Sequence, residues 1–260
     1  MRLDIKARIK KIAPKQVIDL LVPLIYRANK LNTAHIYQAL LKNKSGIEIG
    51  GPSGIFKHTI PVYPIISKLD GVNFSNETLW EGAINSGLNF NYFRNKKGYQ
   101  YIAEATDLGL IKSNSYDFLL SSNCLEHVAN PIKALEEWKR IVVPNGYILL
   151  VLPNKINNFD HRRPITSFKH LLDDFNSDVS EEDLTHLGEI LELHDLSRDP
   201  PAGEYQNFKD RSLNNFKNRG LHHHIFDTDV IKEIFEFMGI TLIQFDITPH
   251  DYIAIGKIQK

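Results

Sequence analysis

The sequence has few of the features that mark secreted, membrane-spanning or nucleic-acid-binding proteins. Cys124 is the single cysteine, which excludes an internal disulfide framework and fits a reducing compartment, with the cytoplasm as the default. No apolar run approaches the roughly 20 residues needed to span a bilayer, and the apolar stretch 17–26 has no signal-peptide cleavage site. The 31 basic and 31 acidic residues cancel, so no overall field attracts nucleic acid or a membrane. We therefore expect a small-molecule partner, no nucleic acid and no stable membrane insertion.

The order of apolar and helix-like segments predicts an α/β fold. With 260 residues, the chain is long enough for one large domain with a sizeable core. Strand-like and helix-like runs alternate from 45 to 155, which predicts a parallel sheet with right-handed crossovers. The clearest helix is expected to begin at Pro131, with Asn130 as its N-cap. A helix over 228–238 and two strand-like runs, 240–247 and 252–258, predict a closing antiparallel hairpin.

Two segments depart from this alternation. Residues 1–44 are expected to be helical, because their apolar residues recur at helical spacing, and the first fifteen residues are basic. Such a start can lie on an anionic membrane or form the solvated face of a helix that covers a ligand site or a homo-oligomer contact. The asparagine-rich stretch 73–98 is expected to be irregular and partly helical, with Trp80 as a packing residue.

A glycine-bearing turn follows the first apolar strand. Residues 46–49 run directly into Gly50-Gly51-Pro52-Ser53-Gly54. Glycine lets the backbone turn sharply and approach a ligand at the carboxyl end of a strand. Pro52 stands where many such turns carry a further glycine; it removes one N–H and fixes a torsion. The turn is therefore a candidate nucleotide-type binding site.

Polar residues also end the later strand-like runs. The second run, 65–70, ends in Asp70, about twenty residues after Gly50, where a ribose-binding carboxylate is expected in a doubly wound sheet. The third ends in acids within 104–107, and the fourth, 116–122, leads into the block Leu125-Glu126-His127-Val128. This ordered set, over about 45–155, resembles the class I S-adenosylmethionine-dependent methyltransferases.

The resemblance implies a fold, a division of the chain and a set of cofactor contacts. The expected fold is a Rossmann-like sheet of seven strands, with an N-terminal helical lid at 1–44, a methyltransferase domain at 45–260 and a substrate-binding insertion at about 154–226 after the fifth strand. The glycine turn would make room for S-adenosylmethionine, the acid after the second strand would bind its ribose, and the turn after the third would border its adenine. The residues implied in cofactor binding are Glu48, Gly50, Gly51, Gly54, Asp70, Glu104, Ala105, Thr106, Asp107, Ser122 and Asn123.

Histidines and arginines within 154–226 are the candidate substrate residues. An extended 222–225 segment would place His222 and His224 on one face. That pair could act as base and orienter, could bind a divalent metal with Asp160 or His161, or could belong to a polar loop that anchors backbone groups. We expect His161, His222 and His224 to surround the acceptor. Arg162 and Arg163 suggest an anionic acceptor, because guanidinium groups suit phosphate and carboxylate.

The predicted activity is S-adenosylmethionine-dependent O-methyl transfer. The Asp-His-Arg-Arg-Pro and Leu-His-His-His stretches are similar to those of methyltransferases found with bacterial capsule and surface-polysaccharide synthesis. That resemblance implies a sugar, a nucleotide-linked precursor or a phosphoramidate as acceptor. The alternatives are a small-metabolite methyltransferase, a non-catalytic cofactor-binding scaffold and a nicotinamide oxidoreductase, the last disfavoured by the terminal hairpin.

Overall fold

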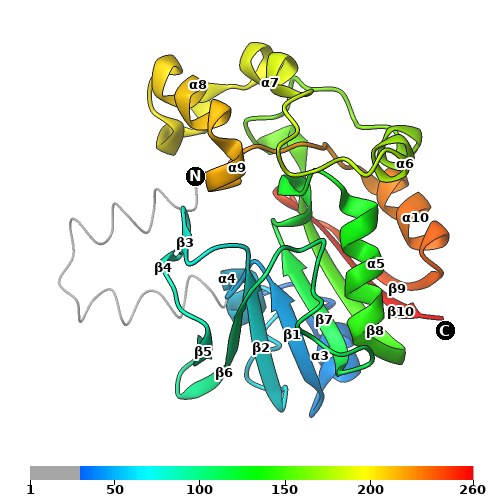
Figure 1. Cartoon of the computed structure of the whole chain (residues 1–260). Helices are drawn as coiled ribbons and strands as arrows, with labels where there is room; N and C mark the ends of the chain where they lie inside the picture. Colours follow the sequence, from blue (N-terminus) through cyan, green and yellow to red (C-terminus); the bar gives the residue numbers. More distant parts are fainter. Residues whose placement is uncertain (1–29, 260) are drawn as a thin grey trace.

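The computed structural model describes residues 30–259, which build one large sheet of eight strands in the order β5-β6-β2-β1-β7-β8-β10-β9 (Figure 1). The strands β1, β2, β6, β7 and β8 pair in parallel, whereas β5, β9 and β10 pair antiparallel to their neighbours. The strand bounds are β1 Ser45–Ile49, β2 Lys68–Asn73, β5 Gly87–Phe93, β6 Lys96–Ile102, β7 Tyr116–Ser122, β8 Val142–Pro153, β9 Ile240–Ile247 and β10 Asp251–Ile258.

The sheet confirms the α/β prediction and corrects the number of strands. Seven of the strands match the expected set, including the closing hairpin β9–β10, and β5 is the addition. The segment 73–98 is therefore not partly helical. It forms β5 and the small two-stranded sheet of β3 (Glu77–Thr78) and β4 (Gly82–Ala83). Alternating aromatic residues of β5 explain this, since Phe90 and Tyr92 are buried while their neighbours are not.

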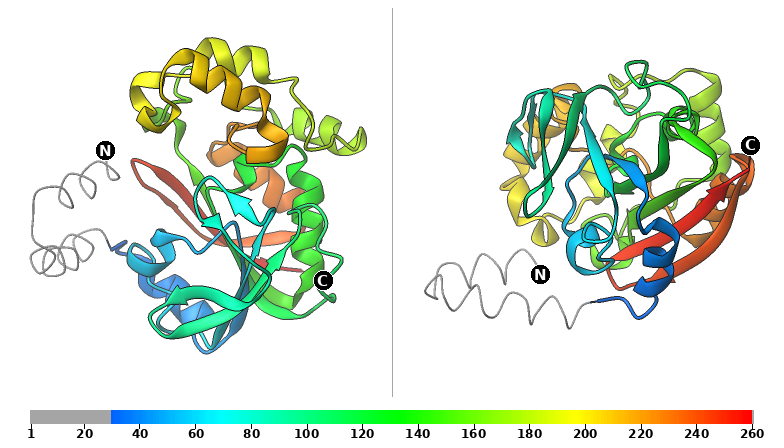
Figure 2. Two further views of the ribbon diagram at one scale, coloured as in Figure 1. Left: turned by 60° about the vertical axis from the view of Figure 1, so that its left-hand side comes forward. Right: turned by 90° about the horizontal axis from the view of Figure 1, so that it is seen from below.

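Helices cover both faces of the sheet (Figures 1 and 2). On one face, α5 (Pro131–Ile141) and α10 (Thr228–Phe237) bury Trp138, Leu135 and Ile234 in the larger core. On the other face, α3 (Ala34–Leu41) and α4 (Gly54–His58) contribute Tyr37 and Phe56 to a second core. The apolar stripes of these helices are therefore what fix the sheet between two layers.

The start of α5 follows the expected capping chemistry. Asn130 accepts a hydrogen bond from the backbone N–H of Lys133, and Pro131 occupies the first turn. The proline needs no N–H there, and the cap satisfies one otherwise free donor. The short helix η1 (Leu125–His127) joins the end of β7 to this start of α5, so it lies at the carboxyl edge of the sheet.

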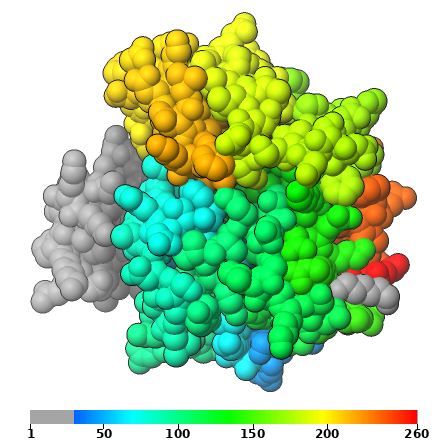
Figure 3. All heavy atoms as spheres, viewed as in Figure 1, coloured from blue at the N-terminus to red at the C-terminus, as the bar shows by residue number. Residues whose placement is uncertain are grey.

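The chain between β8 and α10 forms a layer of short helices (Figure 1, top). Their bounds are η2 Lys155–Asn157, α6 Phe168–Asn176, α7 Leu187–Leu193, η3 Leu196–Arg198, η4 Pro200–Ala202, α8 Tyr205–Leu213 and α9 Asn215–Asn218. Ile190, Ala202, Phe208 and Leu221 give this layer a small core of its own. Figure 3 shows the layer seated directly on the rest of the molecule.

Two further predictions are the N-terminal helical lid and the absence of membrane insertion. Most of the proposed lid at 1–44 lies outside the described residues, which begin at 30. The described remainder includes α3, whose Tyr37 and Leu41 are fully buried in the core. Over residues 30–259, the structure has no helix with the length and apolar character to cross a membrane.

Candidate functional site

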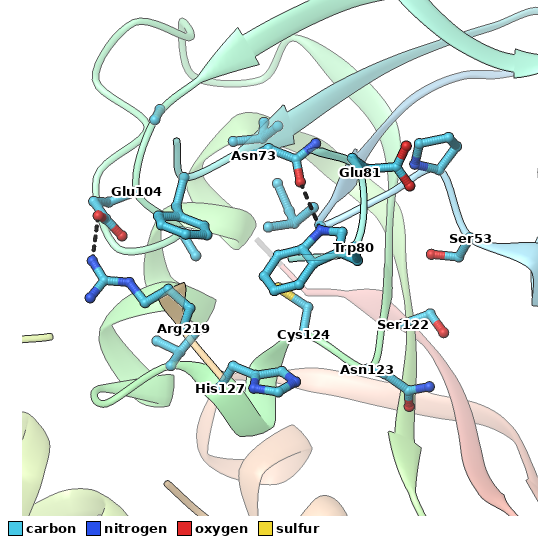
Figure 4. A pocket seen from close by; sticks show the side chains of 18 of the residues that line it. Ser53, Asn73, Trp80, Glu81, Glu104, Ser122, Asn123, Cys124, His127 and Arg219 are labelled. Carbon is cyan, nitrogen blue, oxygen red and sulfur yellow. Dashed lines mark hydrogen bonds and ion pairs between the residues drawn. The ribbon is translucent and has the colours of Figure 1, made fainter. Parts of the chain in front are cut away.

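A cavity of about 350 Å³ opens where β1, β2, β6 and β7 end (Figure 4). This is the edge at which open α/β sheets bind ligands. The lining residues come from these strand ends, from the β3–β4 excursion and from the helical layer: Ile49, Gly50, Pro52, Ser53, Val72, Asn73, Phe74, Trp80, Glu81, Ala103, Glu104, Ala105, Ser122, Asn123, Cys124, His127, Val128, Glu181 and Arg219.

The glycine turn forms one wall of the cavity. Gly50 has a φ of +80°, and a Cβ there would lie 3.0 Å from the side chain of Cys124. At Gly51 a Cβ would lie 2.2 Å from the Cδ atom of Glu48, whereas Gly54 faces open space at the start of α4. Positive φ and close approach both favour glycine. The first two glycines are thus required by the fold of the turn, and Gly50 lines the cavity.

Glu48 supports this turn from behind. Its side chain is fully buried and accepts hydrogen bonds from the backbone N–H of Ser53 at 2.9 Å and from the Tyr63 hydroxyl at 2.6 Å. Burial raises the pKa of Glu48 to about 7, although these hydrogen bonds oppose the rise. The carboxyl group therefore orients the backbone of the turn and is not among the residues that line the cavity.

The structure places Asp70 inside β2 and not at its end. Its carboxylate accepts hydrogen bonds from the Tyr99 backbone N–H at 2.7 Å and the Tyr116 hydroxyl at 2.9 Å, and it pairs with Lys68 at 3.0 Å. The strand begins three residues later than the sequence pattern predicted, because the apolar residues before Lys68 pack in the core as a turn. Asn73 consequently occupies the strand end.

Asn73 lies on the cavity wall and organises its neighbours. Its side-chain amide donates a hydrogen bond to the Gly51 carbonyl at 3.0 Å and accepts one from the indole N–H of Trp80 at 3.3 Å. Figure 4 shows both side chains at the centre of the wall. Trp80 is 43% exposed, and its ring stacks on His127 with a centroid separation of 6.2 Å. It is therefore a wall of the cavity and not an interior packing residue.

The turn after β6 contributes only its first two predicted residues to the cavity. Glu104 and Ala105 line it, and the Glu104 carboxylate pairs with the Arg219 guanidinium at 2.6 Å. Thr106 and Asp107 are not lining residues, and Asp107 accepts a hydrogen bond from the backbone of Gly109. At the end of β7, the predicted Ser122 and Asn123 both line the cavity.

His127 lines the cavity. Its Nδ1–H donates a hydrogen bond to the Leu221 carbonyl at 2.9 Å, which leaves Nε2 as the acceptor. Burial lowers the pKa of His127 to about 3, and His222 contributes to that shift. The imidazole is therefore neutral at physiological pH, with its lone pair available to a ligand.

His222 lies behind His127 and is held by an acid. The rings meet edge to face at 4.6 Å, and the His222 Nδ1–H donates to the Asp160 carboxylate at 2.5 Å. Burial lowers the pKa of His222, but Asp160 outweighs it and raises the pKa overall. Beside this pair, both carboxyl oxygens of Glu126 are buried without a hydrogen-bond partner, and burial raises its pKa to about 7.

The three predicted substrate histidines have separate partners. His222 lies with Glu126 and His127, whereas His224 lies with His170, Asp174 and His186. The third, His161, donates from Nε2 to the Asp195 carboxylate at 2.9 Å. None of these three is among the cavity-lining residues. The structure therefore does not bring them together around one space.

The two predicted substrate arginines differ in exposure. The Arg163 side chain is 1% exposed and bonds to Asp160, to Glu189 and to the carbonyls of His222 and His223. Arg162 is half exposed and lies 3.3 Å from Asp195. Arg163 thus joins the parts of the helical layer to one another, while Arg162 faces solvent.

Sequence reasoning missed several cavity residues: Asn73, Phe74, Trp80, Glu81, Glu181 and Arg219. Asn73 could have been found, because Gly71-Val72-Asn73 ends an apolar strand in the way a ligand-binding strand does. Glu181 and Arg219 reach the cavity from distant parts of the helical layer, and no local pattern marks them.

Comparison with known proteins found one family model and a set of solved structures to which the chain is similar. Residues 66–150 match the family model described as a methyltransferase domain. No curated protein matches the sequence. Solved structures similar to the chain include a SAM-dependent methyltransferase from Aquifex aeolicus, with 12% identity, 97% of this chain and 98% of that chain covered, and a TM-score of 0.46. Another is a SAM-dependent methyltransferase from Methanosarcina mazei, with 17% identity and a TM-score of 0.49. The match covers 88% of this chain and 99% of that chain.

The family match spans part of the cavity wall and leaves out β1 and the Gly50 turn. It begins just before β2 and ends within β8, so it includes the strand ends that carry Asn73, Glu104 and Ser122. The sheet order and the closing antiparallel hairpin complete a Rossmann-like methyltransferase fold. Over residues 66–150 the protein therefore resembles a methyltransferase domain.

Proposed function

We propose that the protein transfers a methyl group from S-adenosylmethionine to a hydroxyl of a polar small molecule. The observation that carries this proposal is His127, which lines the cavity and whose Nδ1–H is tied to the Leu221 carbonyl, so that Nε2 is the acceptor nitrogen of the ring. A hydroxyl is a poor nucleophile until its proton is removed, and His127 is the histidine on the cavity wall that can accept that proton.

The cavity fits the cofactor in size and in its polar groups. Its volume of about 350 Å³ lies within the roughly 300–1,000 Å³ range of small-molecule and cofactor sites. Figure 4 shows Ser53, Ser122 and Asn123 on one side, Glu104 on the other and Asn73 between them. We assign the first group to the amino-acid end, Asn73 to the ribose and Glu104 with Ala105 to the adenine. When bound, the cofactor supplies an electrophilic methyl group on a sulfonium.

In this proposal, His222 and Asp160 position His127. The buried Asp160 carboxylate fixes the His222 ring, whose edge packs on the His127 ring at 4.6 Å. The Trp80 ring also stacks on His127. A ring packed against two others and bonded at Nδ1 keeps its lone pair in one direction, which lowers the entropic cost of proton transfer.

The finer identity of the acceptor stays a prediction from the sequence. A sugar, nucleotide-linked precursor or phosphoramidate in capsular or surface-polysaccharide synthesis is the candidate class. The prediction of an anionic acceptor rests on Arg162 and Arg163, and Arg162 is the more exposed of the two. We therefore assign recognition of an anionic group to Arg162 and a supporting role to Arg163.

A transfer assay with labelled S-adenosylmethionine tests the proposal. Nucleotide sugars, sugar phosphates and free sugars are offered as hydroxyl acceptors, beside a thiol and an amine panel. We expect a hydroxyl acceptor to take the label, and His127→Gln to lower the rate at saturating cofactor by about 10²–10⁴-fold, the usual contribution of a general base. His250→Gln, at an exposed histidine, is the matched control.

S-adenosylhomocysteine affinity is measured for both variants, so that a loss of cofactor binding is separated from a loss of chemistry. Transfer to amines or thiols alone would contradict O-methylation. An unchanged rate in His127→Gln would remove His127 as the base.

A further inference from the structure

Four side chains outside the cofactor cavity converge within the helical layer. They are His170 and Asp174 on α6, His186 at the start of α7 and His224 in the segment before α10. One donor atom from each lies within 4.8 Å of all the others. We propose that these four residues bind a structural zinc ion.

The spacing of the donor atoms supports a tetrahedral site. The Nε2 atoms of His170 and His186 are 3.0 Å apart, and the Oδ2 atom of Asp174 lies 3.3 Å from His170 Nε2 and 3.6 Å from His224 Nε2. Zinc bonds of about 2.0–2.1 Å in tetrahedral geometry place neighbouring donors about 3.3–3.4 Å apart. The three recorded separations thus bracket the value for one shared ion.

Two buried polar atoms of this cluster lack hydrogen-bond partners, which also points to a cation. The Asp174 Oδ2 atom is buried and receives no hydrogen bond, although two imidazole nitrogens lie beside it. The His224 Nδ1 atom is likewise buried without a partner, and its Nε2–H donates to the Ala129 carbonyl at 3.1 Å. Ligation through Nε2 would replace that one hydrogen bond. A bound cation would satisfy the orphaned carboxylate oxygen, which otherwise costs free energy.

The chemistry of the donor set favours zinc. Imidazole nitrogens with one carboxylate oxygen form common tetrahedral zinc sites, whereas magnesium and calcium prefer all-oxygen sites. Four protein donors leave no open position for substrate, which is the arrangement of a structural site. This donor set also differs from the metal ligands considered from the sequence, which paired His224 with His222 and with Asp160 or His161.

The proposed ion would join three parts of the layer that are far apart in sequence. The helix α6 supplies His170 and Asp174, which lie one turn apart, and His186 stands at the start of α7. His224 comes two residues after His222, whose ring packs against His127. Zinc would therefore fix the layer where it supports the cavity wall. This inference does not depend on the identity of the methyl acceptor.

The experiment uses the full-length protein, stripped with a chelator and titrated with zinc by calorimetry. We expect one zinc ion per chain and a rise in thermal stability on zinc addition, because a ligand bound only by the folded state stabilises it. Cobalt added in place of zinc should give the strong visible absorption of a tetrahedral site.

Single variants locate the ion. We expect His170→Ala and His186→Ala each to weaken zinc affinity by at least about tenfold. His250→Ala, an exposed histidine, and Glu126→Gln, from the other histidine-containing group, should leave it unchanged. Absence of zinc binding by the wild-type protein would overturn the proposal. Zinc affinity equal to that of the wild type in His170→Ala and His186→Ala would also overturn it. So would loss of zinc binding in Glu126→Gln.

Discussion

Glu126 is a buried acid whose ionisation is disfavoured by the fold. Neither carboxyl oxygen has a hydrogen-bond partner, and the charged group that most favours ionisation is His222. Burial raises the pKa from 4.5 to about 7, and His222 opposes part of the rise. Between these values the folded protein keeps a proton that the unfolded chain has released.

This difference predicts how stability depends on pH. Because the folded state binds more protons in this window, Glu126 makes the free energy of unfolding fall as pH rises from about 4.5 to about 7. Its share of the slope is at most about 1.4 kcal/mol per pH unit. Urea unfolding at pH 5, 6 and 7 should therefore give a flatter profile for Glu126→Gln than for the wild type. Glu136→Gln, at an exposed position, should keep the wild-type slope. Equal slopes in all three proteins would refute the assignment.

The placement of β2 decides which polar residue lies on the cavity wall. Asp70 is bonded inside the sheet, and Asn73 stands at the strand end on the cavity wall. We expect Asn73→Ala to weaken S-adenosylhomocysteine binding by about tenfold, because one hydrogen-bonding side chain is lost. Asp70→Asn should lower thermal stability with little change in affinity. Calorimetry and thermal unfolding of both variants measure this, and the reverse pattern would return the ribose role to Asp70.

Local signals explain which elements were predictable. The glycine turn, the cap at Asn130 and the closing hairpin each depend on neighbouring residues, and each was anticipated. The eighth strand was not, because the many asparagines of 73–98 masked the alternating aromatic residues of β5. The position of β2 was missed by three residues, because an apolar run that packs as a turn has the same composition as a strand.

Long-range contacts explain what the sequence could not reveal about the site. Arg219 pairs with Glu104 on the cavity wall, and the backbone N–H of His223 donates to the Glu126 carbonyl at 2.7 Å. Both contacts join the helical layer to the sheet edge. The three adjacent histidines were noticed in the sequence, but their partners come from separate segments that only the fold brings together.

At the scale of the whole molecule, Arg163 ties the helical layer together. Its buried guanidinium bonds to Asp160, to Glu189 and to two carbonyls of the 222–223 segment. Removing one partner of a buried ion pair leaves an uncompensated charge and costs about 3–5 kcal/mol.

We therefore expect Arg163→Gln to lower the free energy of unfolding by about 3–5 kcal/mol in urea denaturation. The adjacent Arg162→Gln should change it by no more than about 0.5 kcal/mol, because that side chain is half exposed. Equal effects of the two substitutions would contradict the contrast between a buried connector and a surface arginine.

The central claim is that the cavity at the sheet edge binds S-adenosylmethionine through the Gly50 turn, and calorimetric titration with S-adenosylhomocysteine tests it most directly. We predict micromolar binding by the wild type and no binding of NADH as a control. Gly50→Ala should lose at least about tenfold in affinity, since a side chain at φ +80° is strained and would press on Cys124. Gly188→Ala, where a Cβ meets open space, should bind as the wild type does. Failure of the wild type to bind S-adenosylhomocysteine, or equal binding of NADH, would contradict the account.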